Sequence, residues 1–301
     1  MIRSILKLIR WPNLVMVALT MCFVRYFLVR PILDMSELHL QVAYPDFFFL
    51  VLSVLFITAG GYIINDYFDT KIDIVNKPGE MIIGKVWSRK AAMTLYIILN
   101  AVGVAGGSYV AFKTELPKLG LIFPLTAGIL WFYSVSYKRT FLLGNMIVAL
   151  LSSVVPVMAA IFEKNMYVNF LFIAGYSLFA FLLTMIREII KDIEDKEGDT
   201  EEGCKTIPIV LGVKGAKIIA IFFSFITIAF IAYIQRKQFL SEDKISFWYF
   251  TIALQLPMVI LTILTAMAGE KKGFHRLSTF TKLIMLAGIL SMPIFYYSLL
   301  K

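Results

Sequence analysis

Residues 47–64 read FFFLVLSVLFITAGGYII, and residues 65–73, which follow directly, read NDYFDTKID. The first stretch has no charged side chain and is long enough to cross a bilayer core as an α-helix, which takes about 17–25 residues. The second stretch places Asp66, Asp69 and Asp73 where that helix leaves the bilayer. Together they predict a membrane-spanning helix that presents carboxylates at one membrane surface.

A second acidic segment repeats the spacing of the first. Asp192, Asp195 and Asp199 follow another charge-free run, residues 165–186. In both segments the acids stand at i, i+3 and i+7, which fall within about 60° of one another on a helix and form one stripe. Carboxylate oxygens suit Mg²⁺, which commonly bridges a carboxylate to a substrate phosphate. We therefore predict that the two triads face each other and hold a diphosphate through Mg²⁺.

The composition is that of an integral membrane protein. Hydrophobic residues make up 59% and charged residues 16%, against about 45–50% and 25% in soluble domains. Because the backbone must satisfy its hydrogen bonds within lipid, such runs are expected to be helices. Nine transmembrane helices are predicted, at residues 11–24 (extended past Arg25), 47–64, 91–112, 119–137, 141–162, 165–186, 218–235, 245–269 and 283–300. Arg25 is expected to snorkel or to line an internal cavity.

Charge asymmetry predicts the orientation. Most of the 29 Lys and Arg residues lie in the N-terminus and in the loops after the second, fourth, sixth and eighth predicted helices, on the side of the acidic segments, and cytoplasmic loops hold such an excess. We expect these loops and the N-terminus to be cytoplasmic in a multi-pass protein of the cell (inner) membrane. Residues 1–10, with an apolar helical face and three cations, are expected to lie on anionic membrane lipids. A nucleic-acid partner is not expected, because the cations are spread over short loops.

Other interpretations of the acidic segments fit less well. Neither segment has the Gly and Glu that a Ca²⁺-binding EF-hand loop requires, and the chain has no phosphate-binding Walker loop. A divalent-cation transporter stays open as an alternative, although transporter sites usually lie near the bilayer midplane. A bound diphosphate also needs positive donors, and four cations are candidates on the same side: Lys77, Lys138, Arg139 and Lys205. Each of these is equally explained as a determinant of membrane topology.

The two acidic segments resemble the signatures of the UbiA-type superfamily of intramembrane prenyltransferases, N-D-x-x-D-x-x-x-D and D-x-x-x-D. Asn65, Asp66, Asp69 and Asp73 match the first signature, and Asp195 and Asp199 match the second. Further matching fragments are RWPN at residues 10–13, Tyr133-x-x-x-Tyr137-Lys138-Arg139, and Gly144-Asn145.

The resemblance implies a fold and a chemistry. The expected fold is one domain over residues 1–301, a U-shaped bundle of nine helices around a central cavity, capped by cytoplasmic Asp-rich loops at about 65–90 and 187–217. The expected reaction is transfer of a polyprenyl group from a diphosphate, with Mg²⁺ (or Mn²⁺) and without a redox or organic cofactor. No obligate protein partner is expected. The implied catalytic acids are Asp66, Asp69, Asp195 and Asp199, with Asp73 and Asp192 as further metal ligands and Asn65 beside the diphosphate.

Residues 187–199, with KTIP at 205–208, are similar to the digeranylgeranylglyceryl phosphate synthase branch of that superfamily. This similarity implies geranylgeranyl diphosphate as donor and geranylgeranylglyceryl phosphate as acceptor, whose phosphate Arg187, Lys191 or Arg89 would bind. An aromatic quinone precursor is the alternative acceptor.

Overall fold

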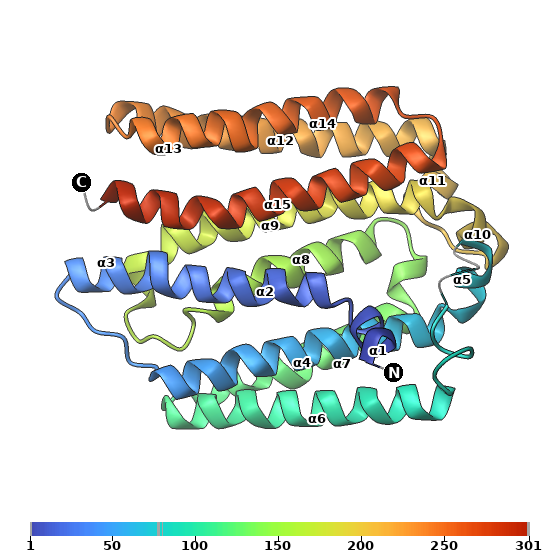
Figure 1. Ribbon diagram of the computed structural model, residues 1–301, viewed down its shortest axis with the longest axis horizontal. Coiled ribbons are helices and arrows are strands. Elements are labelled where there is room, and N and C mark those ends of the chain that lie inside the picture. The colour runs from blue at the N-terminus through green and yellow to red at the C-terminus, as the bar shows by residue number, and fades with distance from the viewer. Residues whose placement is uncertain (1, 77–78, 80, 300–301) are drawn as a thin grey trace.

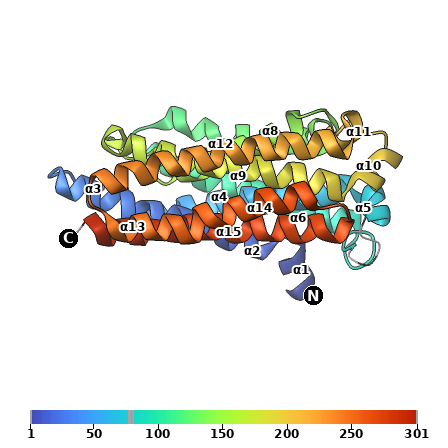
Figure 2. The ribbon, with the colours of Figure 1, turned by 90° about the horizontal axis from the view of Figure 1, so that it is seen from above.

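The computed structural model describes residues 2–76, 79 and 81–299. Long helices lie side by side along one axis, and the short helices α1, α5, α10 and α11 gather at one end, which we call the motif end (Figure 1). Seen from above, α1 projects out of the bundle at this end (Figure 2). The predicted all-α class is confirmed.

The helical elements differ widely in length, from 3 residues in η3 to 29 in α12. The N-terminal half contains α1 (Ile2–Leu8), α2 (Trp11–Phe23), the π-helical η1 (Val24–Val29), α3 (Arg30–Met35), α4 (Tyr44–Phe68), α5 (Thr70–Asn76), α6 (Arg89–Lys113), η2 (Pro117–Leu121), α7 (Ile122–Val135) and η3 (Tyr137–Arg139). The C-terminal half contains α8 (Leu143–Met158), η4 (Met166–Asn169), α9 (Phe170–Glu194), α10 (Lys196–Glu201), α11 (Ile207–Val210), α12 (Gly212–Leu240), α13 (Lys244–Tyr249), η5 (Phe250–Gln255), α14 (Leu256–Met267) and α15 (Lys271–Leu299).

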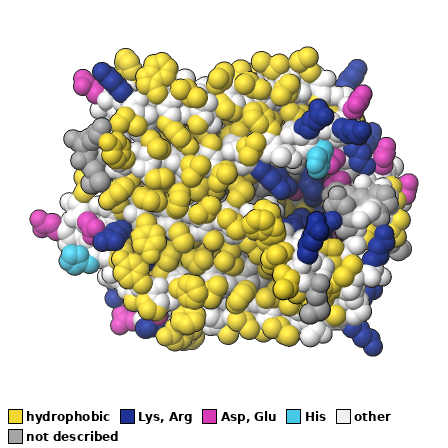
Figure 3. Space-filling view, viewed as in Figure 1, with side chains coloured by type: hydrophobic (Ala, Val, Ile, Leu, Met, Phe, Trp, Pro, Cys, Tyr) yellow, Lys and Arg dark blue, Asp and Glu magenta, His cyan; other side chains and the backbone are white. Residues whose placement is uncertain are grey.

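Eight helical segments of the described chain are long and apolar enough to cross a membrane. The α8 helix is apolar but has 16 residues, just under the usual length for a span. Eight of the nine predicted runs thus correspond to full-length helices. In Figure 3 hydrophobic side chains cover the middle of the surface and charged ones gather at its two ends, as expected for a multi-pass membrane protein.

Two hydrophobic clusters divide the bundle. One includes residues of α2, η1, α4 and α7, such as Leu28, Leu50 and Phe123, and it also includes residues of α8, α9 and α15. The other joins α8, α9, α12, α14 and α15 around residues such as Leu183 and Leu254. Side chains of both clusters line the cavity described below.

Both acidic segments bend where a helix ends. The α4 helix stops at Asp69, with ψ of 2°, and α9 stops at Asp195, with ψ of 4°. The backbone N–H of each of these residues still bonds the carbonyl four residues earlier, so the chain bends and then continues as α5 or α10. The third acid of each triad therefore stands on a separate short helix, although Asp192, Asp195 and Asp199 still line the same cavity.

At the end opposite the motif end, a buried ion pair joins the two halves. Arg25 and Glu163 are 1% and 3% exposed, and Arg25 Nη1 lies 3.2 Å from Glu163 Oε1. The guanidinium also donates to the Val42 carbonyl and stacks over the Phe47 ring, while Glu163 accepts from Gln41 N at 2.7 Å. Arg25 therefore neither snorkels nor lines the cavity, contrary to the sequence-based expectation.

We predict that Arg25→Met or Glu163→Gln destabilises the protein by about 3–5 kcal/mol, because either change leaves a buried partner without its counter-ion. The measurement is the midpoint of thermal inactivation in detergent. The matched control is Arg30→Met, because Arg30 pairs with Asp34 on the surface, where ion pairs contribute about 0–1 kcal/mol. Equal midpoints for Arg25→Met and Arg30→Met would show that the buried pair does not hold the two halves together.

Candidate active site

A cavity of about 370 Å³ opens between the two halves of the bundle. At the motif end its lining is polar and includes Asn65, Asp69, Asp73, Lys138, Lys191, Asp192, Asp195 and Asp199. Deeper in the bundle the lining is largely apolar and includes Val54, Ile57, Phe123, Leu130, Val155, Met158, Phe179 and Met292. Basic side chains border a hollow at the motif end in Figure 3. The cavity thus suits a molecule with a charged head and a long hydrocarbon tail.

The first acidic segment forms one wall of the polar end. Asn65 Nδ2 donates to Asp69 Oδ2 at 2.7 Å, and the Lys138 ammonium forms an ion pair with the same carboxylate. Lys138 comes from η3, between α7 and α8, so this contact ties that connection to the end of α4. Asp73, one turn further on α5, also lines the cavity.

The second acidic segment forms the opposite wall. Asn145 at the start of α8 donates to Asp192 Oδ2 at 2.7 Å, and Lys191 Nζ lies 4.0 Å from Asp195 Oδ2. Burial, together with the charge of Asp195, raises the pKa of Asp199 to about 6. This wall therefore crowds more negative charge than its own cations neutralise.

Asn76 joins the two walls. Its Nδ2 donates to the Asp195 carbonyl at 2.9 Å, and its Oδ1 accepts from the Gly198 N–H at 3.0 Å. A Cβ on Gly198 would stand 2.7 Å from the Asn76 side chain, so glycine permits this close approach. The amide links α5 to the α9–α10 bend and fixes the spacing of the acidic segments.

The donor set suits a magnesium ion that is shared with a ligand. Among the described residues no three His, Cys, Asp or Glu side chains converge tightly enough to enclose a metal by themselves. Carboxylates on two facing walls, with a raised Asp199 pKa, instead favour a hard cation that keeps open positions for phosphate oxygens and water. Asp69, Asp73, Asp195 and Asp199 are the residues in place to hold it.

Asp66 has a different environment from the other predicted acids. It does not line the cavity, and its Oδ1 accepts from Arg10 Nη2 at 2.8 Å. Arg10 itself lines the cavity and lies 4.9 Å from the centre of the Tyr62 ring. Asp66 therefore contacts the cavity through Arg10.

The predicted cations separate into three groups. Lys138 lines the cavity, whereas Arg139 and Lys205 do not. Arg139 and Lys205 contact each other at the motif end, where Lys205 N donates to the Arg139 carbonyl at 2.8 Å. Lys77 lies outside the described residues. Arg89 stacks on Tyr67, 4.0 Å from its ring centre, and is exposed, away from the cavity.

Several cavity residues were not identified from the sequence. Asn76, Arg10 and Glu188 were not predicted as site residues, and Lys282 was counted with the basic loops. Lys282 instead belongs to the long apolar helix α15 and lines the cavity. A charge inside an apolar helix is the signal that identifies it, because such charges usually face the bundle interior.

Comparison with known proteins identifies relatives. The UbiA prenyltransferase family profile matches residues 37–282. Digeranylgeranylglyceryl phosphate synthase of Methanosphaera stadtmanae is 31% identical over 240 residues, which cover 80% of this chain and 84% of that protein. Proteins of the same name are 35% identical over 181 residues in Thermococcus sibiricus and 38% over 177 residues in Pyrococcus furiosus, covering 60% and 58% of this chain. The chain matches about 60% of the length of these last two.

Solved structures share the fold. A structure of digeranylgeranylglyceryl phosphate synthase in membranes superposes with a TM-score of 0.66 at 23% identity, covering 97% of this chain and 96% of that one. A UbiA homologue from Archaeoglobus fulgidus bound to GPP and Mg²⁺ gives a TM-score of 0.61 at 16% identity, covering 96% and 99%. With the profile match over most of its length, the chain belongs to the UbiA prenyltransferase family.

Proposed function

We propose that this protein is a Mg²⁺-dependent prenyltransferase that moves a geranylgeranyl group from its diphosphate to geranylgeranylglyceryl phosphate. The observation that carries the proposal is the cavity: two distant acidic segments and Lys138 line its polar end, and apolar side chains line the rest. Relatives named for this synthase activity support the acceptor. An aromatic acceptor is the alternative outcome of the experiment below.

The proposed topology has nine spans over a single domain, residues 1–301, with α8 as the short ninth span. Its cytoplasmic face is the motif end, because basic side chains gather there (Figure 3) and the positive-inside rule favours that side. The exposed Ile2 and Leu6 of α1 would then rest on the inner leaflet, as interfacial helices do.

The acidic walls are the proposed metal site. Asp69, Asp73, Asp195 and Asp199 would hold Mg²⁺ or Mn²⁺, with Asp192 oriented by Asn145 as a further ligand or support. When bound, the metal supplies positive charge for the oxygens of the departing diphosphate. For Asp66 we propose an indirect role, since its carboxylate holds Arg10 at the cavity.

The basic residues would bind the diphosphate directly. Lys138 faces it from the cavity wall, while Arg139 and Lys205 belong to segments around the motif end. Lys77 is proposed from the sequence pattern alone, because it lies outside the described residues. Asn65 would orient the Asp69 carboxylate through its amide. Preorganised donors of this kind stabilise charge that develops on a leaving group.

The reaction then requires a shielded interior. The C–O bond of the allylic diphosphate breaks, diphosphate leaves with the bonding electron pair, and the acceptor hydroxyl oxygen forms the new ether bond and loses its proton. Aromatic faces of Tyr62, Tyr133 and Phe179 line the cavity. They would exclude water and stabilise the allylic cation through their π systems.

The test offers the purified protein radiolabelled geranylgeranyl diphosphate with Mg²⁺ and one acceptor at a time. We expect labelled ether lipid from geranylgeranylglyceryl phosphate and little product from hydroxybenzoate or dihydroxynaphthoate. Transfer to an aromatic acid alone would replace the ether-lipid acceptor, and absence of all transfer would reject the prenyltransferase proposal.

We predict that Asp69→Ala, Asp195→Ala and Asp199→Ala each lower kcat by at least about 10²–10³-fold, the usual cost of one oriented electrostatic group. Asp66→Ala is expected to cost less, because it acts through Arg10. Excess EDTA should abolish turnover and Mg²⁺ should restore it. Initial rates of protein that elutes normally in size exclusion measure these effects, and rates within a few-fold of wild type for the three variants would contradict the metal site.

We predict that Asn76→Ala and Gly198→Ala each raise the half-saturating Mg²⁺ concentration by about 10–100-fold, because supporting contacts to metal sites typically contribute that much. Asn76→Ala removes both hydrogen bonds between the walls, and Gly198→Ala displaces the Asn76 side chain. The control is Asn100→Ala, a buried amide in α6 that bonds the Tyr96 carbonyl of its own helix. A Mg²⁺ dependence unchanged by Asn76→Ala, or shifted equally by Asn100→Ala, would refute the linking role.

A further inference from the structure

Basic side chains from three helices meet inside the cavity, deeper than the acidic walls. Arg10 stands at the start of α2, Arg187 on α9 and Lys282 on α15, and all three line the cavity. Arg187 precedes Asp195 by eight residues, or about 12 Å along the axis of a helix. We call Arg10, Arg187 and Lys282 the cationic cluster. Its Arg187 stands about two helical turns from Asp195, while its Arg10 contacts Asp66, the acid of the first segment that does not line the cavity.

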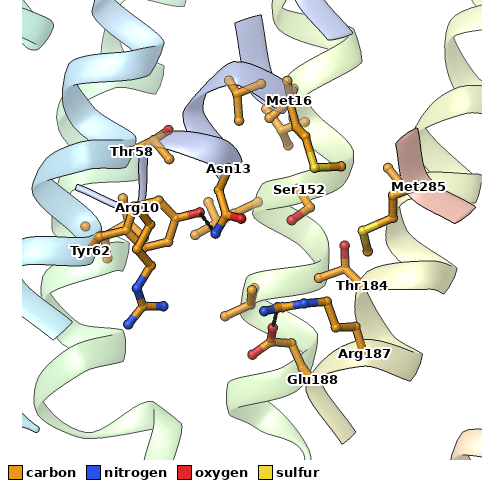
Figure 4. Close-up of a pocket in the computed structure, with 18 of the residues that line it drawn as sticks. Arg10, Asn13, Met16, Thr58, Tyr62, Ser152, Thr184, Arg187, Glu188 and Met285 are labelled. Carbon is orange, nitrogen blue, oxygen red and sulfur yellow. Dashed lines mark hydrogen bonds and ion pairs between the residues drawn. The ribbon is translucent and has the colours of Figure 1, made fainter. Parts of the chain in front are cut away.

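The close-up shows how two of its members lie (Figure 4). Arg10 and Arg187 approach the open space from opposite sides. Polar side chains of Asn13, Ser152 and Thr184 border the same space. The Asn13 amide donates to the Tyr62 hydroxyl at 3.1 Å. This level of the cavity is thus polar, between the acidic walls and the apolar depth.

The cationic cluster carries more positive charge than its neighbours compensate. Glu188 pairs with Arg187 and Asp66 pairs with Arg10. The Lys282 ammonium has no hydrogen-bond or ion-pair partner among the described residues, and the charges of Arg187, Arg10 and Lys191 repel it more than the charge of Glu188 attracts it. The buried Arg187 Nε also has no hydrogen-bond partner among them. Uncompensated charge in a membrane bundle is costly and normally marks a binding function.

We propose that Arg10, Arg187 and Lys282 bind the phosphate monoester of the acceptor lipid. The inference rests on the proposed function and specifies how that function selects its acceptor. A phosphate dianion would supply the counter-charge that Lys282 lacks and an acceptor for Arg187 Nε. Guanidinium groups suit phosphate oxygens because they offer several donors in a fixed plane. Arg89, stacked on Tyr67 outside the cavity, takes no part.

The site predicts discrimination by charge. An acceptor with the same glyceryl ether but no phosphate leaves the cationic cluster uncompensated, so it binds more weakly. The acidic walls do not bind the acceptor's phosphate in the same way, because the cation that they would hold binds the diphosphate of the prenyl donor. The phosphate therefore orients the acceptor with its hydroxyl exposed to the prenyl donor.

Lys282→Met is the most direct test, because among the described residues no hydrogen-bond or ion-pair partner loses a contact when Lys282 is replaced. We expect the KM for geranylgeranylglyceryl phosphate to rise by about 10–100-fold, the range for one lost hydrogen bond between charged groups. The KM for geranylgeranyl diphosphate should rise much less, and the KM for geranylgeranylglycerol, which has no phosphate, should not rise. Without ligand, Lys282→Met should have a melting temperature equal to or above that of the wild type, because the substitution removes a charge that its neighbours repel. If Lys282 had a structural role instead, the substitution would lower the melting temperature.

The matched control is Lys272→Met, the same change at an exposed lysine of the same helix. It should leave every constant at the wild-type value. Binding of the acceptor is also measured directly, without Mg²⁺, from the shift in melting temperature. Geranylgeranylglyceryl phosphate should raise the melting temperature of the wild type and should raise that of Lys282→Met by a smaller amount.

The outcomes separate the two proposals. If the wild type prenylates the glyceryl phosphate but Lys282→Met raises only the KM for the diphosphate, the cationic cluster binds the donor and the inference is overturned. It is also overturned if the wild type uses geranylgeranylglycerol and its phosphate equally well. If the wild type prenylates an aromatic acid only, and the glyceryl phosphate causes no melting shift, the proposed function fails and the acceptor site fails with it.

Discussion

Carboxylates crowded at the mouth of a membrane bundle each need a positive partner or a bound cation, and this requirement organises the motif end. Burial and the charge of Asp195 raise the pKa of Asp199 to about 6, so the crowding is unfavourable in the metal-free protein. Lys138 partly offsets it at Asp69. Because that lysine comes from another helix connection, the contact that neutralises charge also closes the bundle around the cavity.

Contacts other than those of the crowded carboxylates join the two halves of the bundle. The two hydrophobic clusters share the helices α8, α9 and α15, so apolar packing also connects the two halves of the bundle. At the far end the buried pair of Arg25 and Glu163 joins the halves, while at the motif end the Asn76 amide joins the acidic walls. Polar contacts therefore join the two halves of the bundle at both ends of the cavity, in addition to the apolar packing.

Local patterns explain how much of this the sequence predicts. Charge-free runs identify the long helices, because the bilayer fixes both length and composition. Matched acid spacing identifies the segments that face each other. The bends at Asp69 and Asp195 escape prediction, because the acid spacing also fits an uninterrupted helix. The partner of Asp66 escapes it as well, since Arg10 lies 56 residues away. The position of Lys282 also escapes prediction. A count of loop charges treats Lys282 as a determinant of membrane topology, whereas in the structure it belongs to α15 and lines the cavity.

The α9 helix sets the distance between the two charged regions. Arg187, Lys191 and Asp195 follow at four-residue intervals, so they lie along one face of the helix. If the acceptor phosphate binds at Arg187 and the diphosphate at the acidic walls, the backbone positions that hold the two anions are about 12 Å apart along the helix. At an effective dielectric constant of 20, unit charges repel by about 1.4 kcal/mol at that distance, against about 4 kcal/mol at 4 Å. Lys191, between them, reduces the repulsion further. Two anionic lipids can then bind together, with the acceptor hydroxyl and the allylic carbon in the interval between their head groups.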